Sequence, residues 1–193
     1  MFIQTEATPN PATLKFLPGK VVLDMGTADF RAGDDAGAKS PLAAKLLAID
    51  GVAGVFFGYD FITITKSGGA DGKPEWIHMR PAILGTIMEH YVSGQPVMAV
   101  AGAATSMAPD VEDFDPADER IVATIKELLE SRVRPAVAQD GGDITFQGYR
   151  DGRVKLHMKG ACAGCPSSTA TLKHGIQNLL KHFIPEVQEV VQV

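Results

Sequence analysis

The stretch QDGGDITFQGYRDGRVKLHMKGACAGCPSS, residues 139–168, holds both cysteines of this 193-residue chain. Apolar residues alternate on each side of Asp151-Gly152, a dipeptide typical of a two-residue turn. The stretch therefore predicts a β-hairpin with one apolar face directed inward. The predicted inward set is Ile144, Phe146, Val154, Leu156 and Met158. After the hairpin comes a loop of small residues that contains Cys162 and Cys165.

Helical patterns flank the hairpin on both sides. Before it, Asp115 and Pro116 are a typical cap and first residue of a helix with an apolar face, which we expect to end near Pro135. After the loop, Pro166 predicts the start of a second helix, and residues 185–193 predict a final strand. The apolar positions of the second helix are Leu172, Ile176, Leu179, Leu180 and Phe183. The predicted order of this half is α-β-β-loop-α-β.

The first half of the chain also mixes strand and helix patterns. Two extended segments surround the proline turn at residues 9–11, and residues 20–25 suggest a further short strand. Ser40 and Pro41 predict the cap and first residue of a helix. Residues 51–66 predict a hairpin, and residues 73–91 repeat apolar residues at helical spacing. No chemical site is evident in this half from the residues alone.

The composition changes between the two halves. Residues 93–115 are rich in Ala, Gly, Ser and Pro and then become acidic, which predicts a flexible linker. A frayed helix over Ala99–Ala104 is the alternative. We therefore predict the α+β class, with two small α+β domains at residues 1–92 and 115–193 joined by a linker at residues 93–114.

Charge and hydropathy narrow the range of functions. The chain is 45% hydrophobic and 21% charged, with a net charge of −5, which is typical of a soluble globular protein. This balance argues against nucleic acids and anionic membranes as partners, because phosphate recognition needs clustered Lys and Arg. Apolar runs stay well short of the roughly 18 residues of a membrane span. The N-terminal residues resemble neither a secretory signal nor a transit peptide. We expect a cytoplasmic protein in a bacterium, or a trimmed protein of the mitochondrial matrix.

The two thiols lie between a predicted strand and a predicted helix. Because Pro166 is favoured in a first helical turn, Cys165 falls at the N-cap position. The helix dipole and the free amides of the first turn favour anionic sulfur, so both Cys162 and Cys165 are expected to ionise readily. Such a pair can be a dithiol–disulfide redox centre, a zinc site or an iron–sulfur site. The spacing alone leaves redox and metal chemistry equally open.

The number of available ligands favours a metal site shared by two chains. Zinc and the common iron–sulfur clusters take four ligands of this kind, and one chain offers two thiols. His157 is predicted on the outer face of the hairpin, and His174 lies more than two helical turns beyond Cys165, so neither is expected to be a ligand. A two-fold dimer would bring four sulfurs together. Asp140 and Asp143 are interpreted as turn and capping residues rather than as an acid–base pair.

These residues resemble a known family. The segments 139–146, 156–180 and 184–193 are similar to the NifU C-terminal domain, and FIQTEATPNPATLKFLPG, residues 2–19, is similar to the N-terminal domain of Nfu-type proteins. The resemblance implies a cluster scaffold or carrier, not an enzyme, that binds a labile [4Fe-4S] cluster between Cys162 and Cys165 of two chains. It also implies a holo homodimer, upstream cluster donors, apo-protein recipients and an N-terminal docking module. A thiol–disulfide oxidoreductase and a zinc-clasped dimer are the alternatives.

Overall fold

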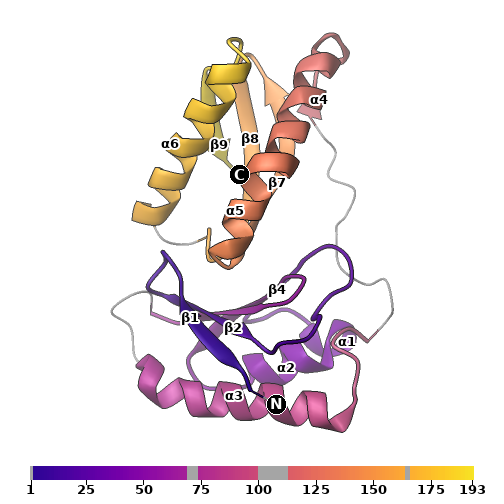
Figure 1. Ribbon diagram of the computed structural model, residues 1–193, viewed down its shortest axis with the longest axis vertical. Coiled ribbons are helices and arrows are strands. Elements are labelled where there is room, and N and C mark those ends of the chain that lie inside the picture. The colour runs from indigo at the N-terminus through magenta and orange to yellow at the C-terminus, as the bar shows by residue number, and fades with distance from the viewer. Residues whose placement is uncertain (1, 69–73, 100–112, 164–165) are drawn as a thin grey trace. The chain divides into compact units, whose positions relative to one another are not determined.

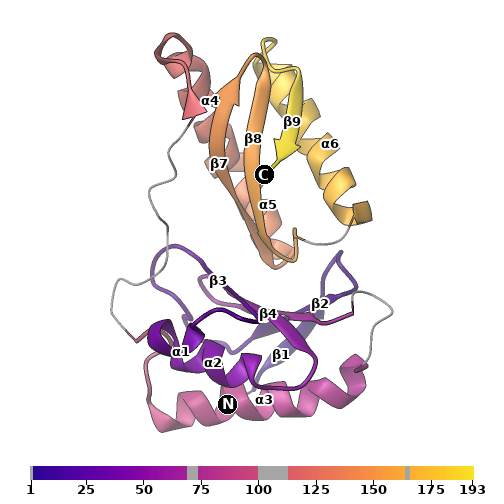
Figure 2. The same cartoon turned by 180° about the vertical axis from the view of Figure 1, so that it is seen from behind.

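The computed structural model describes residues 2–68, 74–99, 113–163 and 166–193, the last range without the side chains of 166–168 (Figure 1). The chain divides into two compact units, Met1–Ser106 and Met107–Val193. Each unit combines one sheet with helices on one of its faces, as both views show (Figures 1 and 2). The predicted α+β class is therefore confirmed.

The first unit has a five-stranded antiparallel sheet of order β1-β2-β5-β4-β3. Its strands are β1 (Gln4–Ala7), β2 (Thr13–Leu17), β3 (Ala28–Arg31), β4 (Val52–Phe57) and β5 (Ile62–Lys66). Its helices are α1 (Ala36–Lys39), α2 (Pro41–Leu47) and α3 (Trp76–Ser93). The α2 and α3 helices cover one face of the sheet (Figure 1).

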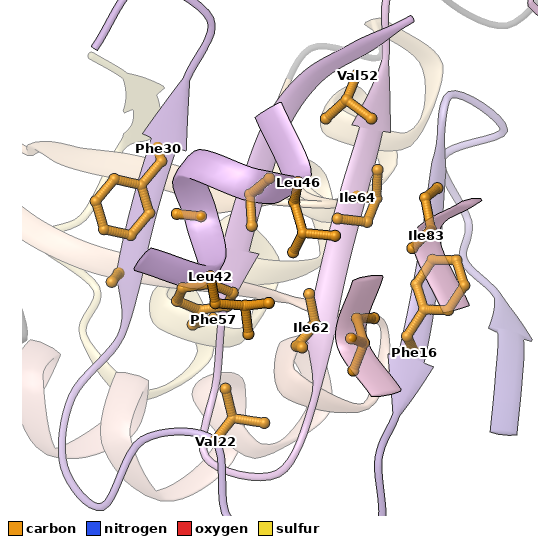
Figure 3. Close-up of a cluster of buried hydrophobic side chains, with 14 of the residues drawn as sticks. Phe16, Val22, Phe30, Leu42, Leu46, Val52, Phe57, Ile62, Ile64 and Ile83 are labelled. Atoms are coloured by element: carbon orange, nitrogen blue, oxygen red, sulfur yellow. The ribbon is translucent and has the colours of Figure 1, made fainter. Parts of the chain in front are cut away.

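The core of the first unit lies between the sheet and these helices. Ile62 and Ile64 project from the sheet towards Leu42 and Leu46 of α2, and Phe16 lies beside Ile83 of α3 (Figure 3). The start of α2 follows its sequence prediction, since the Ser40 hydroxyl accepts a hydrogen bond from the Ala43 amide at 3.0 Å. The predicted residues thus form both the cap and the buried face of this helix.

The TPNP motif near the N-terminus forms a hydrogen-bonded turn between β1 and β2. The Asn10 side chain accepts from the Ala12 amide at 3.0 Å, and the Asn10 carbonyl accepts from the Thr13 amide at 2.9 Å. The Trp76 indole donates to the carbonyl of Pro11 at 3.2 Å. This motif therefore has a structural role, linking the hairpin to the start of α3.

The short strand predicted at residues 20–25 does not form. Val22 and Leu23 are both buried, whereas successive side chains of a strand point to opposite faces of the sheet. Their amides instead donate to the carbonyl of Tyr59, at 2.7 and 3.3 Å. The next strand after β2 is β3, which begins at Ala28 and pairs with β4 at one edge of the sheet.

The second unit has a four-stranded sheet of order β6-β7-β8-β9. Its strands are β6 (Asp113–Phe114), β7 (Gly142–Arg150), β8 (Arg153–Gly160) and β9 (Glu189–Gln192). The β7–β8 pair is antiparallel, and β6 and β9 run parallel to their neighbours. The helices are α4 (Glu119–Leu128), α5 (Arg134–Gln139) and α6 (Pro166–Phe183). The predicted order is confirmed, with β6 as an additional short strand.

The hairpin agrees with its sequence prediction. Asp151 and Gly152 both have positive φ, 49° and 75°, as a tight hairpin turn requires. The register shifts between Phe146 and Gly148, so that a bulge interrupts the alternation of β7. All of the predicted inward residues are buried, namely Ile144, Phe146, Val154, Leu156 and Met158.

One helical prediction in this unit is wrong. The helix before the hairpin does not end near Pro135, because a π-helical turn at Leu129–Val133 shifts the register and places the proline in the first turn of α5. There its missing N–H removes no required hydrogen bond. Among the apolar positions of α6, Phe183 is 45% exposed, and the guanidinium of Arg132 lies 5.1 Å from its ring centroid.

Both ends of the predicted linker belong to the units themselves. The Ser40 hydroxyl donates to the Val97 carbonyl at 2.6 Å, and the Ala99 amide donates to the Lys39 carbonyl at 2.8 Å. At the other end, Asp113 and Phe114 form β6. Residues 100–112, and with them most of the alternative helix at Ala99–Ala104, lie outside the described residues. In the parts of the chain that are described, no helix has the length and apolar character needed to cross a membrane.

Candidate functional site

The residue Cys162 lies in a turn just beyond the end of β8. Backbone hydrogen bonds fix this turn: the Ala161 amide donates to the Gly141 carbonyl at 3.1 Å, and the Cys162 amide donates to the Lys159 carbonyl at 3.3 Å. The positive φ of Gly160, 61°, turns the chain out of the strand. The turn is therefore held against the beginning of β7.

The Cys162 thiol packs directly on Gly142. Only 6% of Cys162 is exposed, and a Cβ atom built on Gly142 would lie 2.5 Å from its sulfur. Gly142 is also paired with Gly160 in the β7–β8 register. The glycine pair at 141–142 lies between Asp140 and Asp143, which the sequence predicted to be turn and capping residues. The structure assigns the turn to Gly141, which has a φ of 82°, and a close-packing role to Gly142.

The protonation state of Cys162 differs from the sequence prediction. Burial, followed by the nearby carboxylates of Asp140 and Asp143, raises the pKa of the Cys162 thiol to about 12. The thiol is therefore protonated at neutral pH in this conformation, and the expectation of ready ionisation is wrong for Cys162. The physical reason is that the sulfur lies inside the unit, out of water and beside two negative charges.

The second predicted ligand, Cys165, lies outside the described residues. The helix that follows it does begin at Pro166, as predicted. In the first turn of α6, the Thr169 hydroxyl donates to the Cys162 carbonyl at 3.1 Å. Thr169 thus ties the helix to the turn that carries Cys162.

A partly buried ion pair supports the same end of the sheet. Arg134 donates to both carboxylate oxygens of Asp143, from Nε at 2.8 Å and from Nη2 at 3.0 Å. The Asp143 carboxylate also accepts from the Ile144 amide at 2.8 Å, while Arg134 contacts Glu130 at 2.6 Å. These hydrogen bonds raise the pKa of Arg134. Asp143 therefore joins α5 to β7, which supports its structural interpretation.

The sequence did not identify Arg134 as a partner of Asp143. Its only signal was an arginine near the end of the preceding helix, nine residues before a carboxylate that follows a glycine turn. The bidentate arrangement adds geometric specificity to the pair. Asp140 is the residue that follows α5, and its side chain is exposed.

The two histidines considered as ligands lie apart from one another. His157 is half-buried and pairs with Thr145 in the β7–β8 register, on the opposite face from its buried neighbours Leu156 and Met158. His174 is exposed on α6, beside a polar hollow lined also by Arg153 and Glu189. Within the described ranges, no three His, Cys, Asp or Glu residues are grouped to hold a metal ion.

Both units match families of known proteins. The family described as "NifU-like domain" matches residues 125–191, and the family "Scaffold protein Nfu/NifU N terminal" matches residues 3–94. The chain is 48% identical, over its whole length, to the human "NFU1 iron-sulfur cluster scaffold homolog, mitochondrial", of which it covers 72%. It is 51% identical to the protein of that name from Drosophila sechellia, of which it covers 65%.

A plant relative also matches along the whole of this chain. The chain is 48% identical to "NifU-like protein 4, mitochondrial" of Arabidopsis thaliana, and it covers 66% of that protein. The chain thus spans between 65% and 72% of the length of these three relatives. Each unit is matched by its own family: the Nfu/NifU N-terminal family matches the first unit, and the NifU-like family matches the second. The chain therefore belongs to the Nfu-type family of iron–sulfur cluster scaffold proteins.

Proposed function

We propose that this chain is a carrier that binds a labile [4Fe-4S] cluster between Cys162 and Cys165 of two chains and passes it to apo-proteins. The observation that carries the proposal is the match of the whole chain to an iron–sulfur cluster scaffold homologue, together with two cysteines that lie three positions apart in the sequence. Four thiolates complete the ligand set of such a cluster, and two chains supply them. The protein itself catalyses no covalent turnover in this proposal.

The loop that carries Cys162 is built from small residues and lies at the start of a helix. Gly160, Ala161 and Ala163 are small, but Cys162 is only 6% exposed, so the turn must open before its sulfur can bind a cluster. The start of α6 lies next to the turn through Thr169, and a helix N-terminus favours negatively charged groups. Iron–sulfur clusters held by four thiolates carry net negative charge.

Anaerobic loading of the full chain with iron and sulfide tests the proposal. We expect the protein to turn brown and to hold about two irons per chain, since one four-iron cluster is shared by two chains. Cys162→Ser and Cys165→Ser should each abolish stable loading. His174→Ala is the matched control, because His174 is exposed on α6, the helix that follows the two cysteines, and the substitution should leave the iron content unchanged.

The same samples separate the alternatives. A zinc-clasped dimer would contain stoichiometric zinc after purification without iron, and a thiol–disulfide oxidoreductase would reduce a protein disulfide catalytically. The loaded carrier should sediment as a dimer. Full cluster content in a strictly monomeric protein would contradict the shared site.

The first unit is proposed to be a docking module for cluster donors and recipients. It matches the N-terminal family domain and contains no cysteine, so it cannot contribute thiolate ligands. Transfer from loaded protein to one apo-protein, measured with and without this unit, tests the role. The names of the three relatives include "mitochondrial", which supports the organellar alternative for the location. A bacterial cytoplasmic location stays a prediction.

A further inference from the structure

The α3 helix of the first unit has two apolar faces. One face packs into the core through Met79, Ile83 and Ile87. On the opposite side, Ile77 is 71% exposed and Val92 is 79% exposed. Amphipathic helices at a protein surface normally place polar residues there. An apolar solvent-facing side therefore needs a separate explanation.

The exposed apolar residues form a continuous stripe along the helix. Its members are Ile77, Pro81, Gly85, Met88 and Val92, all of them exposed. At roughly 100° per residue they fall within an arc of about 80°. The stripe is about 22 Å long at 1.5 Å per residue. Contiguous exposed apolar surface on this scale commonly marks an interaction site.

The stripe is symmetric about its own midpoint, between Leu84 and Gly85. Ile77 and Val92 each lie seven residues from the nearer of these two central residues. Pro81 and Met88 each lie three residues from them. Two antiparallel copies of α3, related by a two-fold axis at this midpoint, would therefore place apolar residues opposite apolar residues along the whole stripe. A surface that complements itself in this way suits an isologous dimer.

The glycine at the centre of the stripe has no evident role within its own unit. An added Cβ atom on Gly85 would meet no atom within 4 Å. Glycine in a helix interior costs about 1 kcal/mol relative to alanine. The absence of a side chain does allow a second backbone to approach closely. Gly85 lies where two paired helices would come nearest.

The charges beside the stripe are compatible with the same pairing. His78 and Glu89 lie along one edge of the stripe, and Arg80 lies along the other. In an antiparallel pair, the same edges of the two helices are neighbours. Glu89, whose side chain is 77% exposed, would then lie beside His78 of the partner subunit. The two copies of Arg80 would be separated by about 13 Å along the helices.

We propose that α3 is a self-association face on which two copies of this chain pair antiparallel, about a two-fold axis between Leu84 and Gly85. The pairing uses no cysteine and does not depend on a bound cluster. A single helix face is smaller than the roughly 1,200 Å² of a stable interface, so the dimer is weak and concentration-dependent.

This pairing would assist the proposed carrier function. Two chains held together by α3 would raise the local concentration of each thiol loop near the other. Capture of a shared cluster then becomes an intramolecular step. This consequence rests on the proposed function, whereas the pairing itself does not.

Sedimentation of the full chain in a cysteine-free background, Cys162→Ser with Cys165→Ser, tests the pairing without cluster bridging. We expect a monomer–dimer equilibrium whose dissociation constant rises at least tenfold in Met88→Lys. Met25→Lys is the matched control, because Met25 is 80% exposed in the loop between β2 and β3 and should leave the equilibrium unchanged. A chain that stays monomeric at all concentrations, or equal effects of both variants, would overturn the proposal.

Cross-linking tests the antiparallel register. In the same background, chains with Ile77→Cys mixed with chains with Val92→Cys should form mixed disulfides faster than either chain alone forms its own. Equal or faster formation of the Ile77→Cys homodimer would overturn the antiparallel arrangement.

A different occupant of the stripe would give a different result. If the chain is monomeric but Met88→Lys slows cluster transfer to a recipient, the stripe is a docking site for recipients and the self-association proposal is wrong. Failure of iron and sulfide loading in the cysteine-containing chain would refute the carrier function alone, since the sedimentation of the cysteine-free chain is independent of it.

Discussion

Replacing Gly142 with alanine would test the packing of Cys162 most directly. The new methyl group would lie 2.5 Å from the Cys162 sulfur, 2.8 Å from the Lys159 carbonyl oxygen and 3.0 Å from the Cys162 amide nitrogen. Optimal contacts of this kind are near 3.5–4 Å, so the turn must move by about 1 Å. Overpacking of this type costs about 1–3 kcal/mol. We therefore expect the second unit to lose about 2 kcal/mol, a factor of roughly thirty in its unfolding equilibrium.

The two units provide an internal control for this experiment. The single tryptophan, Trp76, lies in the first unit, so its fluorescence reports unfolding of that unit. Circular dichroism also detects unfolding of the second unit. In Gly142→Ala we expect the urea midpoint of the second unit to fall and that of the first unit to stay unchanged. Gly175→Ala in α6 is the matched substitution, because an added Cβ there meets no atom within 4 Å. It should stabilise the unit by up to about 1 kcal/mol.

A double-mutant cycle identifies the contact that is responsible. Cys162→Ala removes the sulfur atom, so the combined Gly142→Ala and Cys162→Ala variant should be more stable than the sum of the two single effects predicts. Part of the cost should remain, because the two backbone contacts persist. If Gly142→Ala is no more destabilising than Gly175→Ala, the close-packing role of Gly142 is refuted.

Three further predictions concern single side chains. Arg134→Ala leaves the Asp143 carboxylate buried without its bidentate partner and should cost the second unit about 3 kcal/mol, whereas adding Asp143→Ala should recover part of that loss in the same urea assay. Ser40→Ala removes the hydrogen bonds to the Ala43 amide and the Val97 carbonyl, so the first unit should lose about 1–2 kcal/mol of stability. Urea unfolding followed by Trp76 fluorescence measures this loss, and unchanged stability would contradict the capping role. Burial and then the charge of Lys45 lower the pKa of His90 from 6.5, so the unfolded chain binds a proton more readily than the folded unit. The stability of the first unit should therefore fall as the pH drops below about 6.5, and His90→Gln should remove that part of the acid dependence.

The local features of the fold could be predicted because short-range chemistry determines them. Asp151-Gly152 fixes its hairpin through two positive φ angles, and period-two alternation then selects the buried face. Ser40 and Pro41 fix the start of α2 in the same way. In each case the deciding interactions join residues that are close together in the sequence.

The features that could not be predicted depend on tertiary contacts. Local rules predict that the helix ends near Pro135, but a π-helical turn before the proline allows the chain to continue as α5. The ionisation of Cys162 was predicted from its place before a helix, while its actual environment is set by Gly142 and the carboxylates of Asp140 and Asp143. Burial of this kind has no signature in the spacing of two cysteines.

The burial of Cys162 also bears on the rival redox hypothesis. A thiol–disulfide oxidoreductase attacks with a thiolate that is accessible to its substrate. Cys162 is 6% exposed and packed on Gly142, with a pKa raised to about 12, so it does not suit the attacking role in this conformation. A redox protein would then have to attack with Cys165, and Cys162 would only resolve the mixed disulfide. That mechanism predicts that Cys162→Ser still forms a trapped mixed disulfide with a protein substrate, whereas Cys165→Ser does not. A shared cluster instead needs both sulfurs as ligands, so the two variants should lose iron and sulfide to the same extent. Unequal cluster loss together with a trapped disulfide in Cys162→Ser would favour redox chemistry, and equal loss without trapping would favour the carrier.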